Sequence, residues 1–428
     1  MIVKKILLIL LILIVINNNV EAKDEFVSVD LEESIRLALE NNQTIKQSKA
    51  RQEIAKHNLS EARRKTGFNV DYEFRGEAIG GEHRKHYEGE NADFKHSATV
   101  SIPLYSGGKL ENEQLAAKYA LNAAELELEN TKQEIKYQAS KAYYEVLLWR
   151  DMININEEAV KGLEEYLKKA QAQFELGRAA KADILSVNVQ IANAKKNLRS
   201  AQGEYYKSMA ALNNVIGLPI QTQLAIHDQL KYSKYDLNID ESIEYALKNR
   251  SDVAAANYEV KQAEAIIGAE KSNFRPQIKA EANRTNSGEK IFTTDHERSW
   301  SAGVVASWNI FDNGVTNSKV KEKQAKLKEY ESVVNELNER IKLEVHNAFI
   351  DLQTEEDNIK IVSTAVSQAE EEFSLAQVRY IEGVGNNLAV LDAQEKLFEA
   401  KKNYHNALFN YSSAKAALDK VIGLRAEG

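Results

Sequence analysis

The sequence predicts an α+β chain made of two structural repeats, each with one pair of β-strands and one pair of long α-helices. Three observations predict this fold class. Segments of the chain recur at a fixed offset of 206 residues, apolar and polar residues alternate in short segments of both halves, and only 3 of the 428 residues are proline. A repeat period must be respected by any fold assignment, and a scarcity of proline permits very long uninterrupted helices.

The repeat is visible as identical short segments. Among those that return 206 residues later are Val215–Leu218, as Val421–Leu424, and Gly177, as Gly383. Near the start of each copy the offset is 208 residues, because Glu33-Ser34-Ile35 matches Glu241-Ser242-Ile243. A two-residue insertion or deletion therefore falls between positions 50 and 100. We expect a first repeat at 23–218, a linker at 219–237 and a second repeat at 238–424.

The first 22 residues are typical of a signal peptide. Lys4 and Lys5 precede an apolar run from Ile6 to Ile16, which is too short for a membrane-spanning helix and suits the apolar part of a signal. Val20-Glu21-Ala22 fits a cleavage site. The alternative is a membrane anchor that is retained. We expect an exported mature chain that begins near Lys23.

Composition excludes several classes of protein. The chain has no cysteine, which excludes a disulfide framework and a thiol nucleophile. Its formal net charge is −8, and loss of two lysines and one glutamate with the leader changes this to −9. A mildly acidic chain lacks the basic surface of a nucleic-acid-binding protein, so we expect no nucleic-acid partner.

Strict alternation predicts β-hairpins at about 68–105 and about 276–311. One face of the first strand carries Phe68, Val70, Tyr72 and Phe74, with polar residues between them. Strands of about ten residues with one apolar face suit a transmembrane barrel, with Tyr105, Trp300 and Trp308 at the membrane interfaces. Four strands do not close a barrel, so this interpretation requires several chains: two would supply eight strands and three would supply twelve. The alternative is two ordinary hairpins on a soluble core.

Long helices follow each hairpin. The segments from 109 to about 174 and from 315 to about 380 contain no proline, and each would be about 100 Å long as a helix. Gly177 and Gly383 are placed to end these helices, and return helices are expected at 181 to about 215 and 387 to about 421. Such helices must pack lengthwise on neighbours, as in a coiled coil or a helical barrel. We expect Asp30 and Asp240 to cap the helices that open the two repeats.

The sequence shows no constellation of residues for catalysis. The segment Ser106–Lys109 lacks the upstream glycine and the following Ser or Thr of a phosphate-binding loop. His83 and His86 are close in sequence, but they fall in a polar hairpin tip, where a solvated loop is favoured over a metal site. We therefore predict no enzyme activity, no cofactor and no metal centre.

Motifs at both ends of the long helices resemble those of the TolC-like outer-membrane efflux protein family. The segment Ile102–Gly108, between a strand and a long helix, is similar to the family's Pro-Leu-Phe-Asp/Ser-Gly-Gly element, and Trp308–Gly314 is its repeat copy. The segments Phe174–Leu185 and Tyr380–Gln394 resemble the family's helix-turn-helix tips. The resemblance covers essentially the whole mature chain, because these elements occur twice and in the right order.

This resemblance implies a homotrimer, in which a 12-stranded transmembrane β-barrel continues into a long periplasmic α-helical barrel. The assembly would be the exit duct of a tripartite efflux or type I secretion system, embedded in outer-membrane lipid and extending into the periplasm. Its tip would contact a periplasmic adaptor (membrane fusion) protein, fed by an inner-membrane RND or ABC transporter. The alternative is an exported coiled-coil scaffold or surface adhesin, which needs no lipid-facing aromatic stripe.

The resemblance also suggests how the tip is closed. The family closes its tip with aspartate rings and a Tyr/Arg contact, and the corresponding positions here are Ala389 and Asp392 for the aspartates, Gly385 for the arginine and Tyr380 for the tyrosine. One aspartate therefore remains and the arginine is missing. We expect Asp392 to form an acidic constriction, with Asn386, Asn387 and Tyr380 nearby, that favours cations. The alternative is that Asp392 lies on the surface of the return helix.

Two further sets of residues complete the expected sites. Adaptor contacts are expected at the helical tips, at Gly177, Arg178, Asp183, Leu185, Gly383 and Leu391. Strand-to-helix turns are expected at Pro103, Gly107, Gly108, Asp312 and Gly314.

Overall fold

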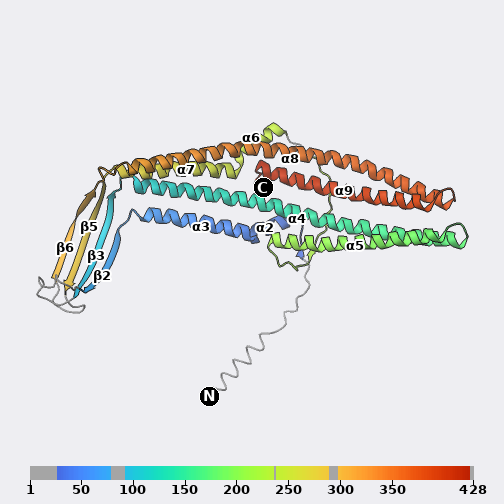
Figure 1. The fold of residues 1–428 in the computed structure, drawn as a ribbon, viewed down its shortest axis with the longest axis horizontal. Coiled ribbons are helices and arrows are strands. Elements are labelled where there is room, and N and C mark those ends of the chain that lie inside the picture. Colours follow the sequence, from blue (N-terminus) through green and yellow to red (C-terminus); the bar gives the residue numbers. More distant parts are fainter. Residues whose placement is uncertain (1–26, 79–91, 236–237, 289–296, 425–428) are drawn as a thin grey trace, which may run out of the picture. The chain divides into compact units, whose positions relative to one another are not determined.

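The computed structural model describes residues 27–78, 92–235, 238–288 and 297–424 (Figure 1). The expected signal peptide at 1–22, both histidines at His83 and His86, and the central parts of the two hairpin tips lie outside the described residues.

The long helices follow the 206-residue offset at every boundary. In the first repeat α4 spans Lys109–Glu175 and α5 spans Lys181–Ile216; in the second, α8 spans Val315–Ile381 and α9 spans Asn387–Ile422. The two longer helices have 67 residues each, which corresponds to about 100 Å. Across the described ranges, no helix is long and apolar enough to cross a membrane.

Two shorter helices open each repeat, at an offset of 208 residues. They are α2 (Leu31–Asn41) and α3 (Gln43–Arg64) in the first repeat, and α6 (Ile239–Asn249) and α7 (Ser251–Lys271) in the second. Asp30 caps α2 as predicted, because its carboxylate accepts a hydrogen bond from the Glu33 N–H at 2.7 Å. The predicted cap Asp240 is wrong: Asn238 caps α6 and accepts from the Asp240 N–H. Asn238 lies 208 residues after Asp30, and asparagine caps a helix as well as aspartate does.

The strands of both repeats join in one antiparallel sheet. β2 (Asn69–Ala78) pairs with β3 (Ala92–Tyr105), β5 (Gln277–Gly288) pairs with β6 (Glu297–Ser307), and β3 pairs with β5, so the order is β2-β3-β5-β6. The central register places Val100 opposite Ala282, and a bulge lies between Pro103 and Tyr105. Because directly paired residues share a face, the apolar positions of all four strands form one apolar face.

The chain packs as two compact units that do not coincide with the repeats. Unit 1 contains the described residues 27–42, 138–233 and 355–413, and unit 2 contains 43–137, 234–354 and 414–424. Each unit therefore takes residues from both repeats. In unit 2, α6, α7 and α8 enclose a core whose most buried members include Ala246, Ile341 and Val345. One boundary between the two units, between Ser233 and Lys234, falls within the expected linker at 219–237, but each unit also contains segments from both sides of that linker.

The segment between the repeats is held against unit 1. Its residues Leu224–Ala225 form β4, which pairs in parallel with β1 (Val27–Ser28). The Arg150 guanidinium on α4 donates to the Ile226 carbonyl at 3.1 Å, and the Tyr143 hydroxyl donates to the Asp228 carboxylate at 2.6 Å. These bonds fix a segment for which the sequence predicts only a linker.

Substituting Tyr143 by Phe is expected to loosen this segment. The Tyr143 side chain is buried, and its hydroxyl is a hydrogen-bond donor to a charged partner, so its loss should cost about 1–3 kcal/mol locally. Limited proteolysis should then cleave the 219–233 segment faster than in the wild type. Tyr206→Phe is the control, because that ring is 67% exposed. Equal cleavage rates for both variants would contradict the assignment.

Candidate functional site

Unit 1 contains two helical hairpins, α4–α5 and α8–α9, and a short turn joins the two helices of each hairpin. In the first turn Gly177 has φ +73°, and in the second Gly383 has φ +77°, a left-handed conformation that favours glycine. The Arg178 N–H donates to the Gln173 carbonyl at 2.8 Å, and the Val384 N–H donates to the Arg379 carbonyl at 3.0 Å. Both turns thus satisfy the last carbonyls of their long helices.

The return helices are capped by different residues in the two repeats. At the start of α5, the Asp183 carboxylate accepts from the Ala180 N–H at 3.0 Å. At the start of α9, the Asn386 side chain accepts from the Ala389 N–H at 2.8 Å. Positions 180 and 183 of the first repeat correspond to positions 386 and 389 of the second. In the first repeat the later residue, Asp183, supplies the side-chain acceptor, whereas in the second repeat the earlier residue, Asn386, supplies it. The exchange of Asp183 for Ala389 therefore has a structural cause.

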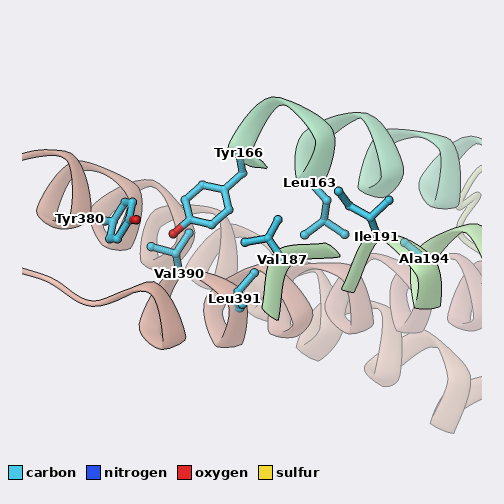
Figure 2. Close-up of a cluster of buried hydrophobic side chains, with 8 residues drawn as sticks. All are labelled: Leu163, Tyr166, Val187, Ile191, Ala194, Tyr380, Val390 and Leu391. Atoms are coloured by element: carbon cyan, nitrogen blue, oxygen red, sulfur yellow. The ribbon is translucent and has the colours of Figure 1, made fainter. Parts of the chain in front are cut away.

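A buried cluster joins the two helical hairpins near these turns. Figure 2 shows its side chains gathered between the hairpin α4–α5, drawn in green, and the hairpin α8–α9, drawn in brown. The members come from all four helices: Leu163, Tyr166, Val187, Ile191, Ala194, Tyr380, Val390 and Leu391. At this end of unit 1, the cluster packs the two helical hairpins against each other.

Tyr166 supplies the polar link within this cluster. Its ring is 2% exposed, and its hydroxyl donates to the Asn387 side-chain oxygen at 2.8 Å. The Tyr380 ring packs beside it, with centroids 5.5 Å apart. The Tyr380 hydroxyl is buried next to that of Tyr166, without a hydrogen bond of ordinary geometry to another described residue. Burial, followed by the neighbouring Tyr380, raises the pKa of the Tyr166 phenol, so Tyr166 remains a donor at physiological pH.

Three residues expected at the pore or at an adaptor surface have core side chains in the described chain. Asn387, Tyr380 and Leu391 are 6%, 9% and 7% exposed. Asn387 accepts from Tyr166, and the other two pack in the cluster, so within one chain these side chains stabilise the tip instead of presenting an open surface. Leu185 and Arg178, by contrast, are exposed, as an adaptor contact requires.

Asp392 is exposed, but its charge is paired. Its carboxylate lies 2.9 Å from the Lys396 ammonium, one turn along α9. Lys396 also contacts Glu372 on α8 at 2.9 Å. The two carboxylates, Glu372 first, raise the pKa of Lys396 above its ordinary value. Any acidic constriction at Asp392 therefore carries a neighbouring positive charge from the same chain.

Gly385 occupies the position where the resembling family has an arginine. A Cβ atom there would lie 3.1 Å from the backbone and Cβ atom of Arg379 and from the Tyr380 nitrogen. The Gly385 N–H donates to the Arg379 carbonyl at 2.9 Å. This close approach of two backbone segments leaves little room for a side chain, which explains the glycine.

Four of the five residues predicted for the strand-to-helix turns lie in two turns of unit 2, and the prediction for Pro103 is wrong. Gly107 and Gly108 have φ +69° and +92°, and the Arg275 guanidinium donates to the Gly107 carbonyl at 3.1 Å. In the other turn, the Asp312 carboxylate accepts from the N–H groups of Gly314 and Thr316. Bonds from Thr316, and then from the Gly314 N–H, lower the pKa of Asp312. Pro103 lies within β3, just before the bulge.

Replacing Gly107 by Ala is expected to impair folding. The new Cβ would lie 2.9 Å from the Ser272 carbonyl oxygen and 3.1 Å from the Arg275 Cβ, and the left-handed backbone adds about 1–2 kcal/mol of strain. The folded fraction, measured by heat-dependent gel mobility, should fall. Gly203→Ala is the control, because nothing lies within 4 Å of its Cβ and alanine favours a helix interior by about 1 kcal/mol. A normal folded fraction in Gly107→Ala would refute this account of the turn.

The sequence pattern alone did not predict a role for Tyr166 or Lys396. A signal was present, because the two repeats differ at these positions. Tyr166 corresponds to Glu372, and Lys396 corresponds to Gln190, at the 206-residue offset. A comparison of the copies around the tips, residue by residue, therefore points to both.

The site consists of packed apolar side chains and surface ion pairs. Among the residues that the structure describes, no three His, Cys, Asp or Glu side chains lie close enough together to hold a metal ion. The exposed acidic residues Asp392 and Glu372 near the tip are both paired with Lys396.

Comparison with known proteins identifies the family. The outer membrane efflux protein family model matches residues 34–218 and 242–424. The chain is 23% identical over 336 residues to the cobalt-zinc-cadmium resistance protein CzcC of Cupriavidus metallidurans, covering 76% of this chain and 77% of the relative. It is 22% identical to the probable efflux pump outer membrane protein TtgC of Pseudomonas putida, covering 77% and 69%.

Solved structures share the whole fold. The outer-membrane channel OprN superposes with a TM-score of 0.80 at 16% identity, covering 93% of this chain and 91% of that one. The CmeC outer membrane channel of Campylobacter jejuni gives 0.80 at 16% identity, covering 93% and 87%, and CusC gives 0.78 at 18%, covering 95% of both chains. The predicted fold class is confirmed. The chain belongs to the outer membrane efflux protein family, and it is an outer-membrane efflux channel.

Proposed function

We propose that three copies of this chain form the exit duct of a tripartite efflux or type I secretion system. The observation that carries the proposal is the four-stranded sheet, whose apolar face is exposed in a single chain. Tyr72 and Trp300 on this face are 68% and 80% exposed, and Phe68, one residue before β2, is 72% exposed. Large contiguous apolar surface of this kind needs a lipid or protein environment.

The sheet also requires partner copies. Its outer strands, β2 and β6, have no further strand beside them in the described chain, and an open sheet edge is not tolerated in hydrocarbon. Three chains would supply twelve strands and close the barrel, with the polar face lining the lumen. The 67-residue helices that follow directly would then extend into the periplasm.

The tips of the long helices are proposed to contact a periplasmic adaptor (membrane fusion) protein. Both turns expose large apolar side chains: Leu176 and Leu185 in the first, and Val384 and Leu388 in the second. Arg178 and Asp183 add charge beside them. An inner-membrane RND or ABC transporter would deliver the substrate, and the channel would be a passive conduit.

Cargo selection is proposed to lie with the pump. The chain is about equally similar to a relative named for cobalt, zinc and cadmium resistance and to one named as an efflux pump component, at 23% and 22% identity. Because relatives from such different systems are similar to most of this chain, the channel itself need not distinguish between substrates.

Fractionation of cells that express the mature protein tests the proposal. We expect it in the outer-membrane fraction, as trimers that resist SDS and dissociate on heating. Recovery of a monomer from the soluble periplasmic fraction would overturn the proposal and favour a scaffold.

A further inference from the structure

The two faces of the sheet differ sharply in charge. All acidic residues of β2, β5 and β6 lie at the alternate positions that form the polar face, and residues 94–105 of β3 contain no acid. The apolar face carries two arginines, Arg284 and Arg298. The register places Arg284 opposite Ala98 and Trp300, and Arg298 opposite Asn286. An apolar face with arginines and no acidic residue is a candidate surface for an anion.

Aromatic and polar groups surround the two arginines on this face. His96 stands opposite Asn286 and Phe74. The Tyr72 hydroxyl and the His96 Nδ1 are 2.7 Å apart, and the Phe74 and His96 ring centroids are 4.8 Å apart. The Asn286 side-chain oxygen is buried and has no hydrogen-bond partner among the described residues.

The arginine side chains are open to a ligand. Both residues are exposed, and neither forms an ion pair with another residue in the described ranges. A neighbouring copy paired at the sheet edge would not neutralise them from the same face, because the apolar face of β2 carries no acid. Among the residues that the structure describes, two adjacent positions along this face thus carry an arginine without an ion-paired acid.

Arg298 lies close to the rim of a membrane-spanning band, and Arg284 lies two residues nearer the middle of that band along the same face. Along β5, Arg284 lies six residues beyond Ile278, and Asn286, opposite Arg298, lies eight residues beyond it. At about 3.4 Å per residue these are about 20 and 27 Å, which a strand tilt of about 40° reduces to about 15 and 21 Å. The apolar band of an outer-membrane barrel is about 25 Å tall. Figure 1 shows these strand ends far from the start of α4, so they face away from the helices of unit 2.

We propose that Arg284 and Arg298 bind the phosphate groups of a phosphorylated glycolipid in the outer leaflet. The planar guanidinium matches phosphate geometry and is weakly hydrated. Tyr72, Phe74 and Trp300 suit the interface, where one end of a side chain is apolar and the other wet. This inference rests on the proposed membrane-spanning sheet.

The test titrates the full-length protein in detergent with diphosphoryl lipid A and measures bound lipid by native mass spectrometry. Phosphatidylglycerol and phosphatidylethanolamine are the comparison lipids. We expect lipid A to bind best, and Arg284→Gln with Arg298→Gln to weaken its apparent affinity about tenfold or more. Arg284→Lys with Arg298→Lys should retain part of the affinity, because lysine keeps the charge without the bidentate geometry.

Arg75→Gln is the matched control, because it removes an arginine from the polar face of the same sheet. It should leave lipid A binding unchanged. Unchanged binding in the double Gln variant, or equal binding of phosphatidylglycerol, would overturn the inference even if the protein still conducts ions. Failure of the wild type to enter bilayers would instead reject the proposed function.

Discussion

Replacing Lys396 by Gln is expected to raise the cation selectivity of the channel about fivefold, and replacing Asp392 by Asn is expected to lower it by a similar factor. The two side chains are 2.9 Å apart on the surface of α9. A unit charge at about 4 Å in water contributes about 1 kcal/mol, which is a factor of about five in ion occupancy. Reversal potentials in planar bilayers under a salt gradient provide the measurement.

Glu372→Gln is the matched control for this pair. Glu372 also contacts Lys396, but it lies on α8 and outside the expected constriction, so its loss should change selectivity little. The pKa of Lys396 is raised above its ordinary value of 10.5. Because its pKa is raised, Lys396 stays protonated and ion-paired at lower pH. The ion pair is lost only as the pH rises through the raised pKa. Selectivity should therefore not change through Lys396 between pH 5 and 9. Identical reversal potentials in Lys396→Gln, Asp392→Asn and the wild type would remove Asp392 from the pore.

Replacing Tyr166 by Phe is expected to loosen the packing of the helical tip. The substitution keeps the ring and leaves the Asn387 oxygen buried without its donor, which should cost about 1–3 kcal/mol. Because this bond joins α4 to α9, we expect faster proteolysis at the helical turns and a larger single-channel conductance.

Two further variants isolate the hydrogen bond from packing. Tyr380→Phe should have little effect, because the Tyr380 hydroxyl makes no such bond in the described structure. Tyr166→Phe combined with Asn387→Leu should restore much of the lost stability, because removing both partners leaves no unpaired acceptor. Equal opening by Tyr166→Phe and Tyr380→Phe would show that the bond does not hold the tip.

Much of the fold was predictable because its signals are local. The long helices end two residues before Gly177 and Gly383, the glycines predicted to end them. The alternation of apolar and polar residues in 68–105 defines the two faces of the strands. The compact units were not predictable in this way. A repeat records duplication, whereas unit 1 and unit 2 each combine parts of both repeats through packing between distant residues.

The tip was only partly predictable, for a different physical reason. Helical spacing shows which residues share a face, but a helix in a barrel is packed on several sides. From the sequence, Asn387 and Tyr380 are therefore equally consistent with pore and core positions. The contact with Tyr166, which lies 221 residues from Asn387 in sequence, places them in the core. The pairing of Asp392 with Lys396 follows ordinary i, i+4 spacing and was within reach of the sequence.

Single-channel recording from the purified mature protein in planar bilayers tests the central claim most directly. If three chains close a barrel that continues into a helical duct, the SDS-resistant trimer should insert and produce discrete conductance steps, with Asp392 and Lys396 setting their selectivity. A trimer that inserts without conducting, or a preparation that remains monomeric and never inserts, would contradict the account.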